Sequence, residues 1–321
     1  MINAYMLTSS GTLARMNWSP QDALPDNVTW IDLQNPNQEE QLCVERALGV
    51  EIPTHEEMSE IEVSSRLYQE DNAYFLTAAV LSRTETGSPN LDPITFVLVG
   101  HRLVTVRYSD PLPIRAFAMQ ALRPGYSDVS GEGILAGLLD AITDRIADLL
   151  EATQRELDTV AQEIFSTQHE DAVDYQDVLR RVGKSQVLVS RVRESLLTLS
   201  RLSAFLSRPG QKAEKNLARK FKTVARDIMA LSDHALFLTS NINFLLDATL
   251  GMINIEQTGI IKIFSVAAVV FLPPTLIASV YGMNFSVMPE LAWEFGYPFA
   301  IALMIISAVL PYVYFKHKRW L

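Results

Sequence analysis

Cysteine is almost absent from this chain of 321 residues, since Cys43 is the only one. A single thiol excludes an internal disulfide framework and a zinc site built from several cysteines. The 5 histidines are scattered, and none has a second histidine at the spacing of a metal-binding pair. The sequence contains no P-loop pattern, no nucleophile–base cluster and no cofactor fingerprint. We therefore expect neither an enzyme nor an organic cofactor.

Positive charge is also in short supply. The chain has 27 Lys and Arg against 37 Asp and Glu, which gives a net charge of −10. An acidic balance of this size argues against nucleic acid as a partner and suits cations better. The first residues lack a basic segment followed by an apolar one, so we expect no secretory signal.

Charged residues are missing altogether from two apolar runs near the end of the chain, Ile263–Tyr281 and Tyr297–Phe315. A helix of about 19 residues is long enough to cross a hydrocarbon core of roughly 30 Å. The residues before these runs have the composition of a soluble protein. The sequence thus predicts a large soluble region followed by a two-span hairpin in a lipid bilayer. A hairpin this small cannot enclose a path alone, so function must come from assembly.

Basic residues set the expected orientation of the hairpin. They precede the first run and follow the second, at Lys262, Lys316, Lys318 and Arg319. The connecting loop contains Glu290 and Glu294 and no Lys or Arg. The positive-inside rule then predicts a multi-pass protein with both termini in the cytoplasm, which in a bacterium means the inner membrane.

The first 125 residues mix strand and helix patterns. Helices are predicted at about Gln38–Leu48, Thr54–Glu60 and Ile114–Leu122, and Gly100-His101 has the form of a tight hairpin turn. Short β-branched or aromatic runs predict strands at Ala4–Thr8, Thr12–Met16, Val28–Asp32, Tyr74–Ser82, Ile94–Val99 and Leu103–Tyr108. We expect an α+β domain with a sheet that is mostly antiparallel or of mixed direction.

After Gly131 and Gly133 the pattern becomes helical. Ile134–Ser166 and Ala172–Ser207 predict two antiparallel arms, and from about Lys212 to Tyr281 no strong breaker occurs before Pro273-Pro274. A helix of about 70 residues would be roughly 105 Å long and needs partners. The expected divisions are an α/β domain, the helical arms, the cytoplasmic part of a long stalk helix and the membrane hairpin, at 1–125, 126–211, 212–262 and 263–321.

One face of the long helix carries a stripe that we call the seam. Its members recur every three or four residues, as in a heptad pattern, and are apolar or small within the predicted span and polar before it. Such a seam fits either close helix packing or a path lined by symmetric copies, and the spacing alone does not decide. The seam comprises Asp247, Leu250, Asn254, Gln257, Ile261, Phe264, Ala268, Leu272, Thr275 and Ser279.

The segment after the first span resembles a known signature. Tyr281-Gly282-Met283-Asn284, followed by Met288-Pro289-Glu290-Leu291, is similar to the motif of the CorA magnesium transporters. Strong resemblance covers roughly residues 250–321, and the N-terminal half is similar in architecture only. The resemblance implies a homopentamer with a cytoplasmic funnel, in which the long helix lines the pore and the second span forms an outer ring. It also implies transport of Mg²⁺, with Co²⁺ and Ni²⁺ as surrogates.

Selectivity is expected at the motif Gly282, Met283 and Asn284. Mg²⁺ sheds water reluctantly, so a ring of Asn284 amide oxygens that binds its hydration waters avoids the energy of stripping them. Gly282 would let the backbone turn closely there. The ordinary alternative is that Asn284 merely caps the end of the helix.

Further residues of the seam and the loop have expected roles. Thr275 and Ser279 would add hydroxyl rings, unless the Thr275 hydroxyl bonds back to its own helix. Ile261, Phe264, Ala268 and Leu272 would line the pore, and the three larger side chains would gate it by dewetting, unless they only pack. Glu290 and Glu294 would either concentrate cations at the mouth or be ordinary solvated charges.

The resemblance also implies closure by cytosolic Mg²⁺ bound between subunits through carboxylates. Candidates on the long helix are Asp227, Asp233 and Asp247, with Glu60, Glu62, Glu70 or Asp71 from the first domain. The alternative for each is a solvated face. Two other functions stay open: a transporter of Zn²⁺ or another divalent cation, as in the ZntB branch, and a membrane-anchored scaffold or sensor.

Overall fold

The computed structural model describes the chain except for residues 10, 17, 20–22, 61, 85–88, 127, 166–172, 207–214, 285–287, 290–292, 319 and 321. It divides into two compact units, Met1–Leu245 and Leu246–Leu321.

The first unit is built on a seven-stranded sheet of order β2-β1-β3-β7-β6-β5-β4. All neighbouring strands are antiparallel except β3 and β7, which are parallel, so the predicted mixed sheet is confirmed. Six strands lie where the sequence predicts them. The strands are β1 (Ile2–Leu7), β2 (Leu13–Met16), β3 (Val28–Gln34), β4 (Leu67–Glu70), β5 (Ala73–Ser82), β6 (Asn90–Val99) and β7 (Arg102–Arg107).

Strand β4 was missing from the sequence prediction because it is a short edge strand without a buried residue. A sequence signal for it exists in the turn that follows. Asp71 and Asn72 join β4 to β5 with φ of 44° and 64°. Two left-handed residues in a two-residue loop are typical of a hairpin turn, and Asp and Asn tolerate this conformation. The turn predicted at Gly100-His101 is confirmed between β6 and β7, with φ of 59° at Gly100.

Helix ends in the first unit follow from capping. The predicted helix α1 (Gln38–Leu48) starts with a capping box between Asn37 and Glu40 and ends at Gly49, whose φ is 71°. A second capping box, between Thr54 and Glu57, starts α2 (His55–Met58), which is shorter than predicted. Two further helices are α3 (Val63–Arg66) and α4 (Leu112–Ala121).

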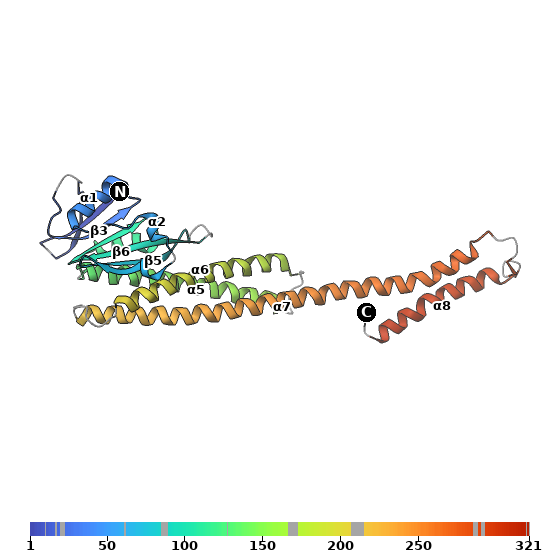
Figure 1. Cartoon of the computed structure of the whole chain (residues 1–321). Helices are drawn as coiled ribbons and strands as arrows, with labels where there is room; N and C mark the ends of the chain where they lie inside the picture. The colour runs from blue at the N-terminus through green and yellow to red at the C-terminus, as the bar shows by residue number, and fades with distance from the viewer. Residues whose placement is uncertain are drawn as a thin grey trace. The chain divides into compact units, whose positions relative to one another are not determined.

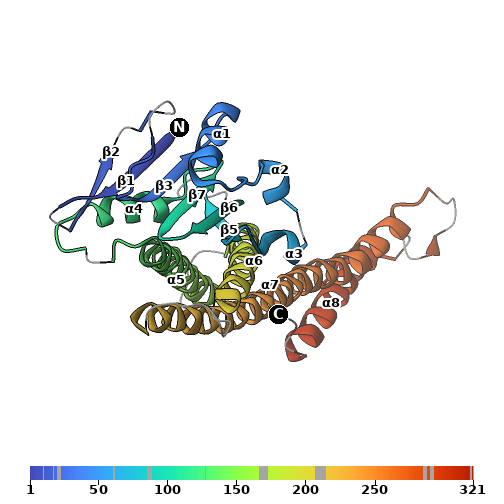
Figure 2. The same ribbon diagram turned by 60° about the vertical axis from the view of Figure 1, so that its left-hand side comes forward.

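Three long helices complete the first unit (Figure 2): α5 (Gly131–Phe165), α6 (Tyr175–Leu206) and the first part of α7 (Lys215–Tyr281). Helix α5 starts three residues before the predicted position, because Gly131 and Gly133 lie inside it. A Cβ on Gly131 would lie 2.6 Å from the Arg102 carbonyl carbon, so this glycine marks close packing on the β6–β7 turn and not a break. Helix α6 is joined to β5 through Ser195 Oγ, which donates to the Ala79 carbonyl at 2.7 Å.

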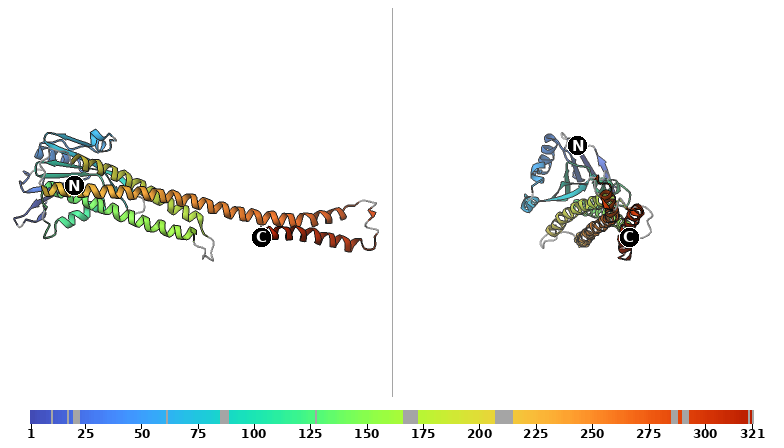
Figure 3. Two further views of the ribbon diagram at one scale, coloured as in Figure 1. Left: turned by 90° about the horizontal axis from the view of Figure 1, so that it is seen from below. Right: turned by 90° about the vertical axis from the view of Figure 1, so that its right-hand side faces the viewer.

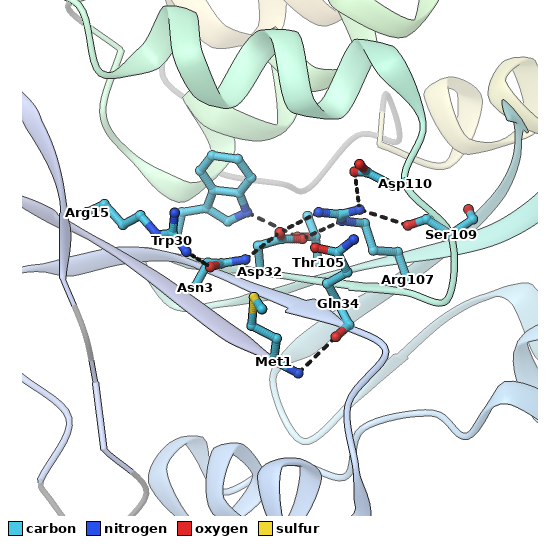
Figure 4. Close-up of polar contacts among 10 residues, drawn as sticks. All are labelled: Met1, Asn3, Arg15, Trp30, Asp32, Gln34, Thr105, Arg107, Ser109 and Asp110. Atoms are coloured by element: carbon cyan, nitrogen blue, oxygen red, sulfur yellow. Dashed lines mark hydrogen bonds and ion pairs between the residues drawn. The ribbon is translucent and has the colours of Figure 1, made fainter. Parts of the chain in front are cut away.

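A buried ion pair joins the two parallel strands (Figure 4). The guanidinium of Arg107 donates to both carboxylate oxygens of Asp32, at 2.9 and 3.0 Å, and Thr105 Oγ1 donates to Asp32 at 2.7 Å. Asp32 and Arg107 are 3% and 4% exposed. Burial lowers the pKa of Arg107, but hydrogen bonds and the charge of Asp32 outweigh it, and the net pKa is raised. The Arg107 guanidinium is therefore held in its charged form inside the sheet.

The second unit is a helical hairpin. Helix α8 (Gly296–His317) runs back beside the end of α7 (Figures 1 and 3). Both helices are long and apolar enough to cross a membrane. The predicted architecture, an α/β sheet domain followed by long helices and two apolar C-terminal helices, is confirmed.

Candidate functional site

The seam lies open along α7. All ten of its residues, from Asp247 to Ser279, are exposed in the single chain. The exposed fractions of Phe264 and Leu272 are 71% and 65%. Large apolar side chains left uncovered by their own chain must be covered by a bilayer or by another copy, or must line a path.

Helix α8 covers a different face of α7. Val266 is 4% exposed, and Val270, Pro273 and Ile277 are partly buried. At 100° per residue these four positions lie nearly opposite the seam. Since α8 is the only other described helix of the second unit, it must pack on this face. The seam is therefore turned away from α8.

Two hydroxyl groups on or beside the seam are engaged as donors within the helix. Thr275 Oγ1 donates to the Phe271 carbonyl at 2.7 Å, and Ser265 Oγ donates to the Ile261 carbonyl at 2.7 Å. This is the bond within the helix that the sequence left as an alternative for Thr275. The oxygen lone pairs of Thr275 stay available as acceptors for hydrogen bonds, and the waters bound to a hydrated cation are donors of this kind.

The motif residues follow directly after α7. The Gly282 amide donates to the Ala278 carbonyl at 2.9 Å, and a Cβ at Gly282 would lie 3.1 Å from that oxygen. Met283 and Asn284 are exposed. Asn284 is not one of the described non-glycine residues with positive φ, so it does not end the helix as a left-handed cap. Glu294 is exposed, and Glu290 lies outside the described residues.

The three candidate aspartates on α7 are exposed but do not share one face. Asp233 and Asp247 are two heptads apart and lie on the seam face. Asp227 is near Asp140 of α5 instead. The pKa of Asp140 is raised, first by burial and then by the charges of Asp144 and Asp227. Sequence reasoning overlooked Asp140 and Asp144, although their spacing of four on one helix was a usable signal.

These carboxylates do not form a complete metal site with the other described residues of the same chain. Among the described residues, no group of three or more His, Cys, Asp or Glu could hold a metal ion. A site that uses Asp233 or Asp247 therefore needs ligands from outside the described residues of a single chain.

The structure thus has an exposed seam that leads to a Gly-Met-Asn turn, on the first of two membrane-length helices. The sequence that builds these features matches a known family. A family model described as "CorA-like Mg2+ transporter protein" matches residues 25–317. The chain belongs to this CorA-like family. Its members are ion transporters, so the chain is a transport protein and not an enzyme. The resemblance drawn from residues 250–321 is confirmed and extends across nearly the whole chain.

Individual relatives agree with the family. The magnesium transport protein CorA of Yersinia pseudotuberculosis is 35% identical over 321 residues, covering 100% of both chains. The complete structure of the CorA magnesium transporter from Methanocaldococcus jannaschii matches with a TM-score of 0.76 at 18% identity, covering 100% of this chain and 99% of that one. The ZntB cytoplasmic domain from Vibrio parahaemolyticus matches with a TM-score of 0.61 at 12% identity, covering 78% of this chain and 97% of that one. The two structural matches show the fold alone, so they do not discriminate between transported ions.

Proposed function

We propose that this chain is the subunit of a passive Mg²⁺ channel driven by the membrane potential. The observation that carries the proposal is the exposed seam on the face of α7 opposite α8. Copies arranged around an axis with their seams inward would enclose a path and leave α8 outside. An inside-negative potential supplies about 4.6 kcal/mol per 100 mV to a dication, twice the single-charge value, so no nucleotide is needed.

The assembly is a homopentamer in a bacterial inner membrane, with both termini in the cytoplasm. The five-fold symmetry rests on the family resemblance, and the orientation rests on the basic residues at Lys262, Lys316 and Lys318. The four-part division at 1–125, 126–211, 212–262 and 263–321 belongs to the same proposal.

Selection occurs at a ring of Asn284 side chains, with Gly282 and Met283 shaping the turn. A dication that keeps its waters loses little hydration energy, and neutral amide oxygens bind those waters without holding the ion too tightly for release. The same ring would pass Co²⁺ and Ni²⁺. The exposure of Asn284 and the absence of a left-handed cap at this residue support the proposal.

Below the filter the seam forms the rest of the path. Thr275 and Ser279 present hydroxyl oxygens, and the apolar rings at Ile261, Phe264 and Leu272 close the path by dewetting, with Ala268 between. Glu290 and Glu294 raise the cation concentration at the outer mouth.

Cytosolic Mg²⁺ closes the channel by bridging carboxylates of neighbouring subunits. Asp233 and Asp247 suit this role because they lie on the seam face, and Asp227 is a weaker candidate because Asp140 and Asp144 lie near it. Mg²⁺ is thus both the transported and the regulatory ion.

The test is Mg²⁺ entry into proteoliposomes under an imposed inside-negative potential. We expect uptake by the wild type and its loss in Asn284→Ala, with Gln162→Ala, which removes an exposed amide on α5, as a control that keeps the flux. Both variants must elute at the wild-type size, so that a loss of flux reports on the filter and not on assembly.

The other outcomes are decisive as well. Uptake of Zn²⁺ but not of Mg²⁺ would mean that the chain is a zinc transporter with the same fold. Flux of neither ion would favour the membrane-anchored scaffold. Wild-type Mg²⁺ uptake by Asn284→Ala would remove Asn284 from the filter.

A further inference from the structure

Helix α8 carries an apolar groove that the transport proposal does not use. The groove has a volume of about 640 Å³ and ends at His317. From Ile305 to His317 it extends ~18 Å along the helix, more than half the thickness of a hydrocarbon core. Its other lining residues are Ile305, Ile306, Val309, Leu310, Val313 and Tyr314.

The groove lies on the side of α8 away from α7. Gly296 and Ala300 are buried and Ser307 and Ala308 are partly buried, so these small residues of α8 face α7, together with larger ones such as Met304, Pro311 and Phe315. Helices in membranes pack through small residues of this kind, because these let the two backbones approach. The groove has branched and aromatic side chains instead. The lining contains no small residue through which a second helix would pack closely, and this favours a flexible acyl chain as the occupant.

Cations gather where the groove ends. Lys316 and Lys318 flank His317 at the end of α8. Lys262 of α7 lies at the same level, with its Nζ 6.0 Å from the centre of the Trp320 ring. A Trp beside Lys side chains at the end of a span is typical of the headgroup region of a bilayer.

We propose that α8 binds an anionic phospholipid, with one acyl chain in the groove and the phosphate beside Lys316 and Lys318. The groove alone would accept the chain of any lipid, whereas the cations select a negatively charged headgroup. Each Lys near an anionic lipid surface strengthens binding by about fivefold. This lipid site is independent of the ion that the seam conducts.

The first experiment measures lipid retention. The purified full chain is equilibrated in detergent with equal amounts of phosphatidylglycerol and phosphatidylcholine, and the retained lipids are counted by native mass spectrometry. We expect excess phosphatidylglycerol on the wild type and roughly a twentyfold loss of this preference in Lys316→Gln/Lys318→Gln. The matched control, Lys222→Gln/Arg226→Gln, removes two exposed cations from α7 in the first unit and should retain the preference. Equal retention of both lipids by the wild type would overturn the proposal.

The second experiment separates the possible occupants. Val309→Trp fills the groove and should release phosphatidylglycerol while Lys316 and Lys318 are unchanged. Displacement of the lipid by millimolar inorganic phosphate would show a site for free phosphate and not for a phospholipid. Ile306→Cys tests for another copy, because Cys43 is buried. A disulfide between two copies of the Ile306→Cys variant would show that a second chain covers the groove, and the proposal would then be wrong.

Discussion

The two compact units of this chain differ in where their side chains find partners. In Met1–Leu245 even the charged pair Asp32 and Arg107 is buried and bonded within the same chain. In Leu246–Leu321, Val266 and Ala300 are the only described hydrophobic side chains that are buried. The first unit has a complete core, whereas the second leaves nearly all of its described apolar side chains exposed or only partly buried.

This difference explains why similar changes should have different consequences in the two units. A change in the first unit alters folding, because its partners lie in the same molecule. If the seam lines the path, as proposed above, a change on it should alter conduction with little effect on the fold of one chain.

The largest effect is expected for Asp32→Ala, which leaves Arg107 buried without its main partner. Removing one member of a buried ion pair costs about 3–5 kcal/mol of stability. Urea unfolding of the full chain, followed by tryptophan fluorescence, should show this loss. The control Arg115→Ala removes a half-exposed partner of Asp110, and its loss should stay below ~1 kcal/mol. Similar unfolding midpoints for Asp32→Ala and Arg115→Ala would mean that the buried ion pair does not stabilise the first unit.

Next in size is Leu272→Asn, which places an amide in the middle of the seam. A polar residue there should hold water in the apolar constriction and raise Mg²⁺ leak several-fold in proteoliposomes. Ile263→Asn is the control, since Ile263 is 61% exposed against 65% for Leu272 but lies nine residues away on α7, which at 100° per residue is the opposite side of the helix. Equal leak from both variants would mean that the seam is not the path.

A smaller effect is expected for Asp247→Asn. Loss of one carboxylate per subunit should raise the internal Mg²⁺ concentration needed for inhibition several-fold, while the maximal flux stays near that of the wild type. The control Glu194→Gln alters an exposed carboxylate on α6 and should leave inhibition unchanged. Unchanged inhibition in Asp247→Asn would leave this residue as an ordinary solvated charge.

The smallest effect is expected for Asp140→Asn. Burial and the charges of Asp144 and Asp227 raise the pKa of Asp140 in the folded chain. A raised pKa means that its stabilising contribution is complete below the unfolded value of about 3.9 and is lost as the pH rises through the folded value. Asp140→Asn should therefore raise the free energy of unfolding slightly at pH 7, by well under ~1 kcal/mol after solvent screening, and with it Tm, but not at low pH. A lower Tm at pH 7 would contradict this sign.

The sequence predicted those parts of the fold that depend on local chemistry. Strand and helix patterns and the Gly100-His101 turn act within a few residues, so they are readable without a structure. Gly131 was misread as a boundary, because its role depends on the backbone of Arg102, which is distant in the sequence.

The candidate site was readable in part for the same reason. Helical periodicity identified the seam, and the structure adds that α8 packs on the opposite face. The nearness of Asp140 to Asp227 was not readable, since it depends on how α5 and α7 pack. Contacts between copies lie beyond any single-chain pattern, so the roles of Asn284, Asp233 and Asp247 stay predictions.

The sheet order has a consequence for synthesis on the ribosome. Strands β2, β1 and β3 form one antiparallel group and β6, β5 and β4 another, and β7 joins them at the centre. The central strand is thus the last to emerge. Trp30 can pair with Leu103 only after about seventy further residues have been synthesised, which takes several seconds at ~5–20 residues per second. During that interval strand β3 has no partner on its β7 side, and residues 102–107 then pair with both β3 and β6.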